Sequence, residues 1–520
     1  MTGRSRSPST ERRPFAFRGT PGSSMRRPLL GLLLCLLPAG AAAAVGEAVP
    51  VVAAFHVHST WSTGSASLDG LAAAAERAGI QAVILTENYL ARFEYGLLPF
   101  RRILRWSEGV SSLTPERLPA YLAAVREAQA RHPGVLLVPG VEVLPHYRWS
   151  GSPWNGTLTL HNTQKNLLVV GLDLPALKGL PVAGNTEGVP IRWGASAAAV
   201  VGAVLLATAG VYLAGSRSRR RIPLQRVTVV EARPRRLPGV ALILLAVLLL
   251  LNNFPARAFP FDPYRDAGVA PYQALIRYVA EGGGLTFWSL PEARDLHVLS
   301  RGPFRVTVRT EPYPEDLLAT DGYTGFGGIY EDTTTFTDPG GGWDRRLQEF
   351  ALGRRRTPGW AVGEAAYHFE GQAGKSLVNV LTVLWVRERT VGGVTEALRA
   401  GRGVAVQGTA AYRLGLDRFE VSAGGRPAGI GETLVAPPGA PVLVRTAVAA
   451  SDGMAHPIEV LLVRSGEVVA RRAGPTPLAL EYREGGPGEA ADVYRVQVRG
   501  ETPHQLLSNP IFVRRGGAGA

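Results

Sequence analysis

The chain is 520 residues long, which exceeds one average domain and predicts two or three folded units. Hydrophobic residues make up 46% of it and charged residues 19%, a balance that excludes a disordered or fibrous protein. The net charge is +14, but residues 1–30 carry a net +6 and residues 217–236 a net +7. The remainder is nearly neutral, which argues against a basic nucleic-acid-binding face on the folded body.

The N-terminus has the pattern of a secretory signal peptide. A basic segment leads into a short apolar run over residues 29–37, and small residues follow. This order predicts export, with cleavage near residues 42–44 and a first segment of residues 1–45. Translation from Met1 or from Met25 would supply the basic flank equally well. Cys35 is the only cysteine and lies in this segment, so we expect no disulfide in the mature chain.

Two apolar runs in the middle of the chain flank the second basic segment. Residues 194–215 carry no charge and would span roughly 33 Å as a helix, whereas residues 237–251 would span about 22 Å. Eight Arg and one Glu lie between them, which is the positive-inside pattern of a cytoplasmic loop. We therefore expect a transmembrane hairpin over residues 191–258, with the membrane as partner and the main domains in the periplasm or cell exterior. Core helices of a soluble domain are the alternative.

On each side of the hairpin, strand-like and helix-like segments alternate. The expected strands are 51–55, 82–86, 135–143, 166–171, 285–289 and 360–363, and the expected helices are 68–78, 114–131, 271–281, 344–352 and 394–400. Repeated βα units predict a parallel α/β sheet or barrel over residues 46–190 and 259–403, which the hairpin interrupts. Chemistry is expected at the carboxyl ends of its strands.

The last part of the chain, residues 404–520, has a different texture. Short alternating runs are separated by Gly and Pro, and no helical period intervenes: 418–422, 441–449, 458–464, 467–473, 492–499 and 510–513. This predicts an antiparallel, Ig-like β-sandwich with a structural or recognition role.

The most specific motif is His56-x-His58 at the end of the first strand. Two His at positions i and i+2 point to the same side of a strand, so both imidazoles can reach one metal ion. Other polar residues end later strands: Glu87 and Asn88 the second, Glu142 the third, and a segment from Glu364 to His368 comes near the end of the βα region.

These pieces, in this order, resemble the PHP (polymerase and histidinol phosphatase) family over residues 50–400. The resemblance implies a distorted (β/α)7 barrel that holds two or three divalent metals for phosphoester hydrolysis. The exported arrangement with a trailing β-sandwich is similar to the carbaryl-hydrolase-like metallohydrolases of that family. By position, the resemblance makes His56, His58, Glu142 and His368 metal ligands.

The sequence also departs from the family pattern. Non-ligand or weakly ligating side chains replace four expected ligands: Asn88, Asn166, Leu290 and Ala366. Amides are poor ligands for transition metals, and Leu and Ala offer no donor, so we expect at least the second and third metal sites to be lost. Glu87 and His161 are the candidate substitutes.

Two alternatives remain open for the function. In the first, the four surviving ligands hold one divalent ion (Mn, Zn or Fe), and the protein is a weak hydrolase of small phosphoesters or related esters and amides. In the second, no metal binds and the protein is a non-catalytic pseudoenzyme, a binding or scaffold protein of the cell envelope.

Overall fold

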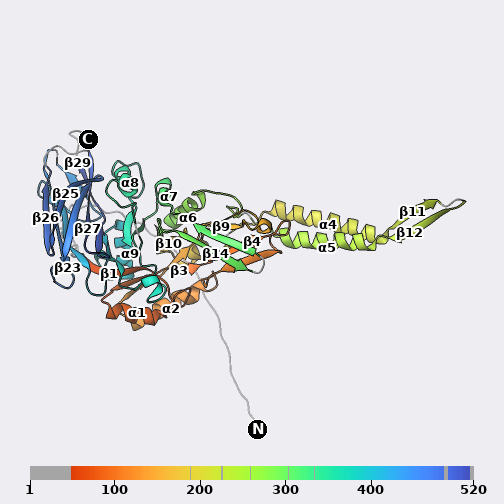
Figure 1. Cartoon of the computed structure of the whole chain (residues 1–520), viewed down its shortest axis with the longest axis horizontal. Helices are drawn as coiled ribbons and strands as arrows, with labels where there is room; N and C mark the ends of the chain where they lie inside the picture. Colours follow the sequence, from red (N-terminus) through yellow and green to blue (C-terminus); the bar gives the residue numbers. More distant parts are fainter. Residues whose placement is uncertain are drawn as a thin grey trace, which may run out of the picture. The chain divides into compact units, whose positions relative to one another are not determined.

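The structure is a computed structural model, and it describes residues 48–515 except 188, 224–225, 258, 302–303, 333, 438 and 485–489. The described residues belong to one compact unit, Gly46–Ala520. The predicted signal peptide, residues 1–45, lies outside the described residues. The unit has a mixed α/β part and a strand-rich C-terminal part (Figure 1).

Two sheets build the α/β part. In the first sheet, β1 (Val49–Val57), β2 (Ala82–Leu85) and β6 (Leu136–Val138) are parallel neighbours, and β18 (Val380–Val386) pairs antiparallel with β1. The second sheet has the order β17-β16-β13-β10-β7-β3. Its strands are β3 (Glu87–Tyr89), β7 (Gly140–Val143), β10 (Leu167–Val170), β13 (Leu285–Trp288), β16 (Gly325–Ile329) and β17 (Trp360–Gly363).

The two sheets share continuous chain segments. Only Thr86 separates β2 from β3, and only Pro139 separates β6 from β7. The prediction of one strand over 135–143 is wrong in this respect, because Pro139 has no N–H with which to continue the ladder. Gly140 permits the crossing, since a Cβ there would lie 2.7 Å from the carbonyl oxygens of Leu85 and Val169.

Backbone hydrogen bonds link the last strand of the second sheet back to β1. Ala365 N donates to Phe55 O, Tyr367 N donates to His56 O, and His58 N donates to Tyr367 O, each at 2.9 Å. Within the described residues the pairing therefore runs around a ring: β1, β2/β3, β6/β7, β10, β13, β16, β17 and back to β1. The expected all-parallel arrangement is wrong for β10, which is antiparallel to both β7 and β13.

Helices pack against these sheets. Most of them coincide with the predicted ones to within a few residues: α1 (Leu68–Arg77), α2 (Leu118–Arg131), α6 (Ala270–Glu281), α8 (Gly342–Ala351) and α9 (Val391–Ala400). Two short helices were not predicted: α3 (Leu174–Lys178) and α7 (Pro314–Ala319). The N-cap predicted for α1 is present, since Ser67 accepts a hydrogen bond from Gly70 N.

The two apolar runs form α4 (Trp193–Gly215) and α5 (Arg236–Asn253), both long and apolar enough to cross a membrane. They lie side by side, because Gly210 and Gly239 bring the two backbones so close that a Cβ on Gly210 would lie 2.7 Å from Gly239 O (Figure 1). Most of their side chains are exposed, which does not match core helices of a soluble domain. The Arg-rich segment between them forms a hairpin of β11 (Arg217–Pro223) and β12 (Thr228–Pro234), which was not predicted.

The C-terminal part consists almost entirely of strands, as expected. One sheet has the order β21-β20-β23-β26, and the other strands extend the first sheet of the α/β part. The strands are β20 (Leu414–Ala423), β21 (Arg426–Ala428), β22 (Thr433–Ala436), β23 (Val442–Ala450), β24 (Pro457–Arg464), β25 (Glu467–Pro475), β26 (Leu478–Arg483), β27 (Ala491–Arg499), β28 (Gln505–Ser508) and β29 (Ile511–Arg515).

Two features of this part differ from the prediction. The pair β22–β29 is parallel, so the strands are not all antiparallel. In addition, β19 (Gly403–Gln407) pairs with β18 on one side and with β28 on the other, so one sheet runs across the boundary predicted at residue 404.

A further small sheet and a hairpin come from segments without a predicted element. The sheet has the order β14-β15-β9-β8, from Asp295–Arg301, Phe304–Thr310, Thr159–His161 and Arg148–Ser150. The hairpin pairs β4 (Arg92–Gly96) with β5 (Arg105–Gly109). Aromatic side chains beside these strands form their own core, in which Trp149 packs edge-on against Tyr95 and Trp106.

Candidate metal centre

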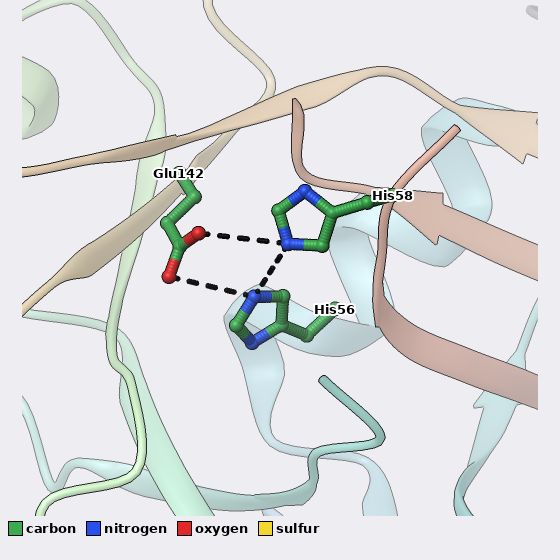
Figure 2. A group of neighbouring side chains, drawn as sticks. All are labelled: His56, His58 and Glu142. Atoms are coloured by element: carbon green, nitrogen blue, oxygen red, sulfur yellow. Dashed lines mark hydrogen bonds and ion pairs between the residues drawn. The ribbon is translucent and has the colours of Figure 1, made fainter. Parts of the chain in front are cut away.

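Three potential metal ligands converge at one end of the strand ring. The atoms they offer, from His56, His58 and Glu142, all lie within 4.8 Å of one another, and all three residues are buried. The two imidazole Nε2 atoms are 3.0 Å apart, and each lies 3.5 Å from a carboxylate oxygen of Glu142. Figure 2 shows the two rings and the carboxylate turned toward a common point.

The backbone that presents the two His is not a regular strand. The register of β1 against β2 shifts between Phe55 and Val57, and His56 has a left-handed φ of 69°. The prediction that a regular i, i+2 alternation aims both rings is therefore wrong in its geometry. The irregularity at His56 is held in place by the hydrogen bonds that β1 forms with the chain after β17.

Strand polarity explains why these side chains meet. His56 and His58 lie at the carboxyl end of β1, and Glu142 lies in the last half of β7. Asn166 comes immediately before β10, and because β10 is antiparallel its amino end faces the same edge of the ring. The side chains therefore converge at the carboxyl ends of the strands, as expected, and the amino end of the antiparallel β10 adds Asn166 to them.

A buried carboxylate lies behind His56. Glu364, which follows β17 directly, has its Oε1 2.6 Å from His56 Nδ1. Ser289 Oγ donates to the same oxygen, and Leu290 N donates to Glu364 Oε2 at 3.0 Å. Gly327 makes room for this side chain, because a Cβ at that position would collide with Glu364 Oε2. A carboxylate on the far nitrogen of a ligating imidazole sets its tautomer and raises its basicity.

A parallel arrangement orients His58. Its Nδ1 lies 3.2 Å from Ser62 Oγ, and Ser62 in turn donates to Glu87 Oε2. Glu87 also accepts hydrogen bonds from the backbone N–H and hydroxyl of Ser59. Burial raises the pKa of Glu87, and these donors oppose that rise. Glu87 therefore holds the loop after β1 and connects to His58 only through Ser62, so it is not one of the three converging groups.

The electrostatics of the three groups are strongly coupled. Burial alone would lower the pKa of His56, but the charges and hydrogen bonds of Glu142 and Glu364 outweigh it and raise that pKa to about 9. Burial would likewise raise the pKa of Glu142, yet His56 and His58 bring it down to about 2. Burial lowers the pKa of His58 well below its usual value. In the metal-free protein, a protonated His56 ring therefore faces Glu364 at one nitrogen and Glu142 at the other. The same negative charge would also favour a bound cation.

His368 lies against the cluster but not within it. Its ring stacks on that of His58, with centroids 4.2 Å apart and planes 7° apart, and its Nδ1 is 2.7 Å from Thr63 Oγ1. Burial, with the His56 charge, lowers the pKa of His368 to about 4, so its imidazole is neutral at pH 7. Asn88 fills the adjoining space, and its Nδ2 donates to Thr63 Oγ1 at 2.9 Å.

The other replaced positions also surround the cluster. Asn166 Nδ2 donates to Glu142 Oε1 at 2.7 Å, and its buried Oδ1 has no hydrogen-bond partner among the described residues. Leu290 and Ala366 both adopt a left-handed φ of 43°. The structure does not bring His161 here: it lies in β9, and its Nε2 is 2.7 Å from Ser150 Oγ.

The donor set fits a single divalent ion. Ligands at 2.0–2.1 Å in tetrahedral geometry are separated by about 3.3 Å, close to the observed 3.0 and 3.5 Å. Two imidazoles and one carboxylate match catalytic zinc sites and also sites for other first-row metals. The unpartnered Oδ1 of Asn166, beside Glu142, leaves one further weak oxygen donor for an ion or its water.

Sequence reasoning missed two residues of this region. Glu364 begins the segment that ends at His368, and its position directly after a buried strand could have identified it as a site residue. Lys375 was not singled out: its Nζ donates to Ala366 O at 3.0 Å, and its charge acts on His58 and His368. Burial lowers the pKa of Lys375. Lys375 lies 318 residues after the end of β1, so no local sequence pattern would place it beside the histidines of that strand.

Comparison with solved structures finds matches at low sequence identity. A two-domain protein from Bacteroides vulgatus, which contains a predicted PHP-like metal-dependent phosphoesterase, is 12% identical, covers 86% of this chain and 90% of its own, and has a TM-score of 0.32. A chain from Bifidobacterium adolescentis assigned as a metal-dependent phosphoesterase is 14% identical, with 62% and 88% covered and a TM-score of 0.25. An amidohydrolase from Chromobacterium violaceum, with bound sulfate and no metal, gives the same four values.

The structural neighbours of this chain are PHP-like phosphoesterases and an amidohydrolase. No family model matches the chain, and no curated protein matches it. With TM-scores of 0.32 and below, the structural matches carry no conclusion about activity, so the chemistry has to come from the side chains of this chain.

Proposed function

We propose that the protein is a membrane-anchored, exported hydrolase of the PHP type with one divalent ion at His56, His58 and Glu142. One observation carries the proposal: three buried ligand groups converge while Glu364 holds the far nitrogen of His56. The ring of strand pairings supports a distorted (β/α)7 barrel as its scaffold. The substrates would be small phosphoesters or related esters and amides.

The residues around the ion would have different roles. When bound, the ion would polarise the phosphoryl or carbonyl oxygen and lower the pKa of a water molecule. Glu364 and Ser62 hold the rings of His56 and His58 in place from behind. His368, neutral at pH 7, would complete the ligand set, as the family pattern implies. Lys375 places a positive charge nearby, which favours an anionic substrate.

We propose a weak activity, because a two-metal mechanism needs ligands that this chain has replaced. Two ions about 3.5–4 Å apart have to be bridged and fixed by carboxylates or imidazoles. Asn88, Asn166, Leu290 and Ala366 supply none of these groups. A single ion retains Lewis-acid chemistry but loses the clamp on both the attacking and the leaving oxygen.

Metal analysis of the full-length protein, purified in detergent, tests the proposal. The expected result is about one Mn, Fe or Zn per chain, its loss in His56→Ala, and its retention in His161→Ala, which removes a histidine outside the cluster. Hydrolysis of phosphomonoesters, phosphodiesters and carboxyl esters is then measured with both variants. Absence of stoichiometric metal after reconstitution with all three ions would refute the metal centre.

A non-catalytic scaffold is the second candidate, and one observation favours it. Asn166 Nδ2 donates a hydrogen bond to Glu142 Oε1 at 2.7 Å. One of the few remaining ligand oxygens is therefore already engaged, which weakens it as a metal ligand. For a scaffold, added metal or chelator leaves the melting temperature unchanged, and the ester panel shows no turnover. For the hydrolase, metal raises the melting temperature by mass action.

We further propose that α4 and α5 anchor the protein in a membrane and that its main domains lie in the periplasm or cell exterior. The exposed apolar surface of both helices and the Arg-rich segment between them support this orientation. Alkaline phosphatase inserted within residues 222–230 should be inactive, and the same enzyme fused after Val513 should be active. The reverse pattern would overturn the export proposal.

A further inference from the structure

An apolar groove lies beside the β4–β5 hairpin, and none of its lining residues belongs to the candidate metal centre. Its volume is about 300 Å³, at the lower end of the range for ligand pockets. Apolar and aromatic side chains make up most of its walls: Tyr95, Leu97, Leu104, Trp106, Leu158 and Val306. Such a groove matches an apolar ligand rather than a phosphoester.

The tip of this hairpin is attached to the end of the apolar helix pair. Arg102 N donates to Asn252 Oδ1 at 2.9 Å, and Asn252 Nδ2 donates to Pro99 O at 3.3 Å. Arg102 Nη1 also donates to Pro255 O at 2.9 Å. Asn252 is the penultimate residue of α5, so the hairpin that lines the groove is joined at its tip to the end of this helix.

Exposed aromatic residues lie at the beginning of α4 and at the end of α5, which are adjacent. Trp193, the first residue of α4, is 71% exposed, and Phe254, directly after α5, is 44% exposed. The two ends adjoin, because Arg192 N donates to Ala256 O at 2.8 Å. Aromatic residues gather at the boundary between a bilayer core and water. If α4 and α5 span a membrane, the groove therefore lies at its surface.

The hairpin tip itself has the composition of a membrane-contacting loop. Leu98 is 74% exposed and Leu104 is 51% exposed, which is unusual for neighbouring leucines on a water-facing surface. The same short loop carries Arg101 and Arg102, whose charges complement anionic headgroups. Leucines beside arginines thus match the boundary between acyl chains and phosphates.

One polar group beside the groove lacks a partner. The guanidinium of Arg101 stacks on the ring of Tyr264, 3.6 Å from its centroid. Its Nε is buried and has no hydrogen-bond partner among the described residues. Arg105, by contrast, is already paired, since its Nη1 donates to Glu94 Oε2 at 2.7 Å. An unsatisfied buried guanidinium N–H indicates an acceptor such as a phosphate oxygen.

We propose that this groove binds one acyl chain of a phospholipid from the bilayer that holds α4 and α5, with the lipid phosphate at Arg101. The site would fix the domain's orientation on the membrane surface. The proposal depends on the membrane anchoring proposed above and is independent of the metal centre.

The test uses the full chain in nanodiscs that contain phosphatidylglycerol with a photoreactive diazirine on one acyl chain. After illumination, mass spectrometry maps the adducts. We expect adducts on peptides that contain residues 95–106 and 153–158, in addition to those on α4 and α5. Leu104→Trp, which fills the groove without adding polarity, should reduce the groove adducts at least fivefold and leave the helix adducts unchanged.

Two further variants keep the test specific. Arg101→Gln should weaken groove labelling and make it insensitive to salt, whereas Leu352→Trp, at a comparably exposed leucine elsewhere, should change nothing. Adducts on α4 and α5 without groove adducts would overturn this proposal and leave the anchoring intact. Absence of both would overturn the anchoring as well. Crosslinks in the groove to residues 1–47 or to a second copy would show that protein, not lipid, occupies it, and would also overturn the proposal.

Discussion

Replacing Glu364 with glutamine removes the carboxylate behind His56 while nearly preserving the size of the side chain. The carboxylate lies 2.6 Å from His56 Nδ1 and is fully buried, so its charge is little screened by water. In the wild-type protein it keeps an N–H on Nδ1, so that Nε2 is the nitrogen left to bind an ion shared with Glu142. A glutamine can still accept a hydrogen bond, but it no longer raises the basicity of the ring.

The size of the effect follows from this one contact. Loss of a group that orients a ligating histidine typically costs 10- to 100-fold in metal affinity. That range corresponds to about 1.4–2.7 kcal/mol, which agrees with the roughly 1.5–3 kcal/mol of a hydrogen bond to a charged group. At pH 7 part of this loss is offset, because the variant imidazole also holds its competing proton less tightly. The loss in affinity should therefore be larger at pH 9 than at pH 7.

Competition of Zn against a chromophoric chelator at the two pH values measures these affinities. Glu484→Gln is the matched control, since Glu484 is a buried carboxylate elsewhere that pairs with Arg464 at 3.1 Å. Melting temperatures of the metal-free variants report on folding, because Glu364 also accepts from Ser289 and Leu290 N. An affinity within twofold of wild type, in a variant that melts normally, would refute the assignment of Glu364 as the orienting group.

Three further predictions concern affinity, pH and stability. Gly327→Ala should also lower metal affinity, because its new methyl group displaces the same carboxylate; unchanged chelator competition would contradict this. In protein freed of metal by a chelator, the charged pair of His56 and Glu142 should stabilise the fold fully between about pH 4.5 and 6.5. The contribution of His56, on the order of 3 kcal/mol at most, is lost as pH rises through about 9, and that of Glu142 is lost as pH falls through about 2. A wild-type minus His56→Gln difference in melting temperature that stays flat with pH would count against the pair. Arg495→Ala should destabilise the fold by about 3–5 kcal/mol, because it leaves Asp344 buried without the two 2.7 Å bonds that now join it to Arg495; a denaturant titration showing less than 1 kcal/mol would exclude this role.

Local sequence patterns determined the elements of this protein well. The strand of residues 360–363 and the helices at 68–78 and 271–281 were found within a residue or two, because apolar periodicity and capping act over a few neighbours. The same holds for the apolar helices, whose length and composition are properties of contiguous residues. The His-x-His and Gly-Val-Glu motifs were recognisable for a similar reason, since they end buried strands.

Only the tertiary structure decided how these pieces come together. The contact between His56 and Glu364 joins residues 308 positions apart, and no local pattern encodes such a pairing. The antiparallel direction of β10, the crossing of β6/β7 between two sheets, and the attachment of the β4–β5 hairpin to α5 depend likewise on chain topology. Which buried groups acquire partners is set by packing around the whole ring. The sequence identified the candidate ligands His56, His58 and Glu142, whereas only the fold brings them to one point.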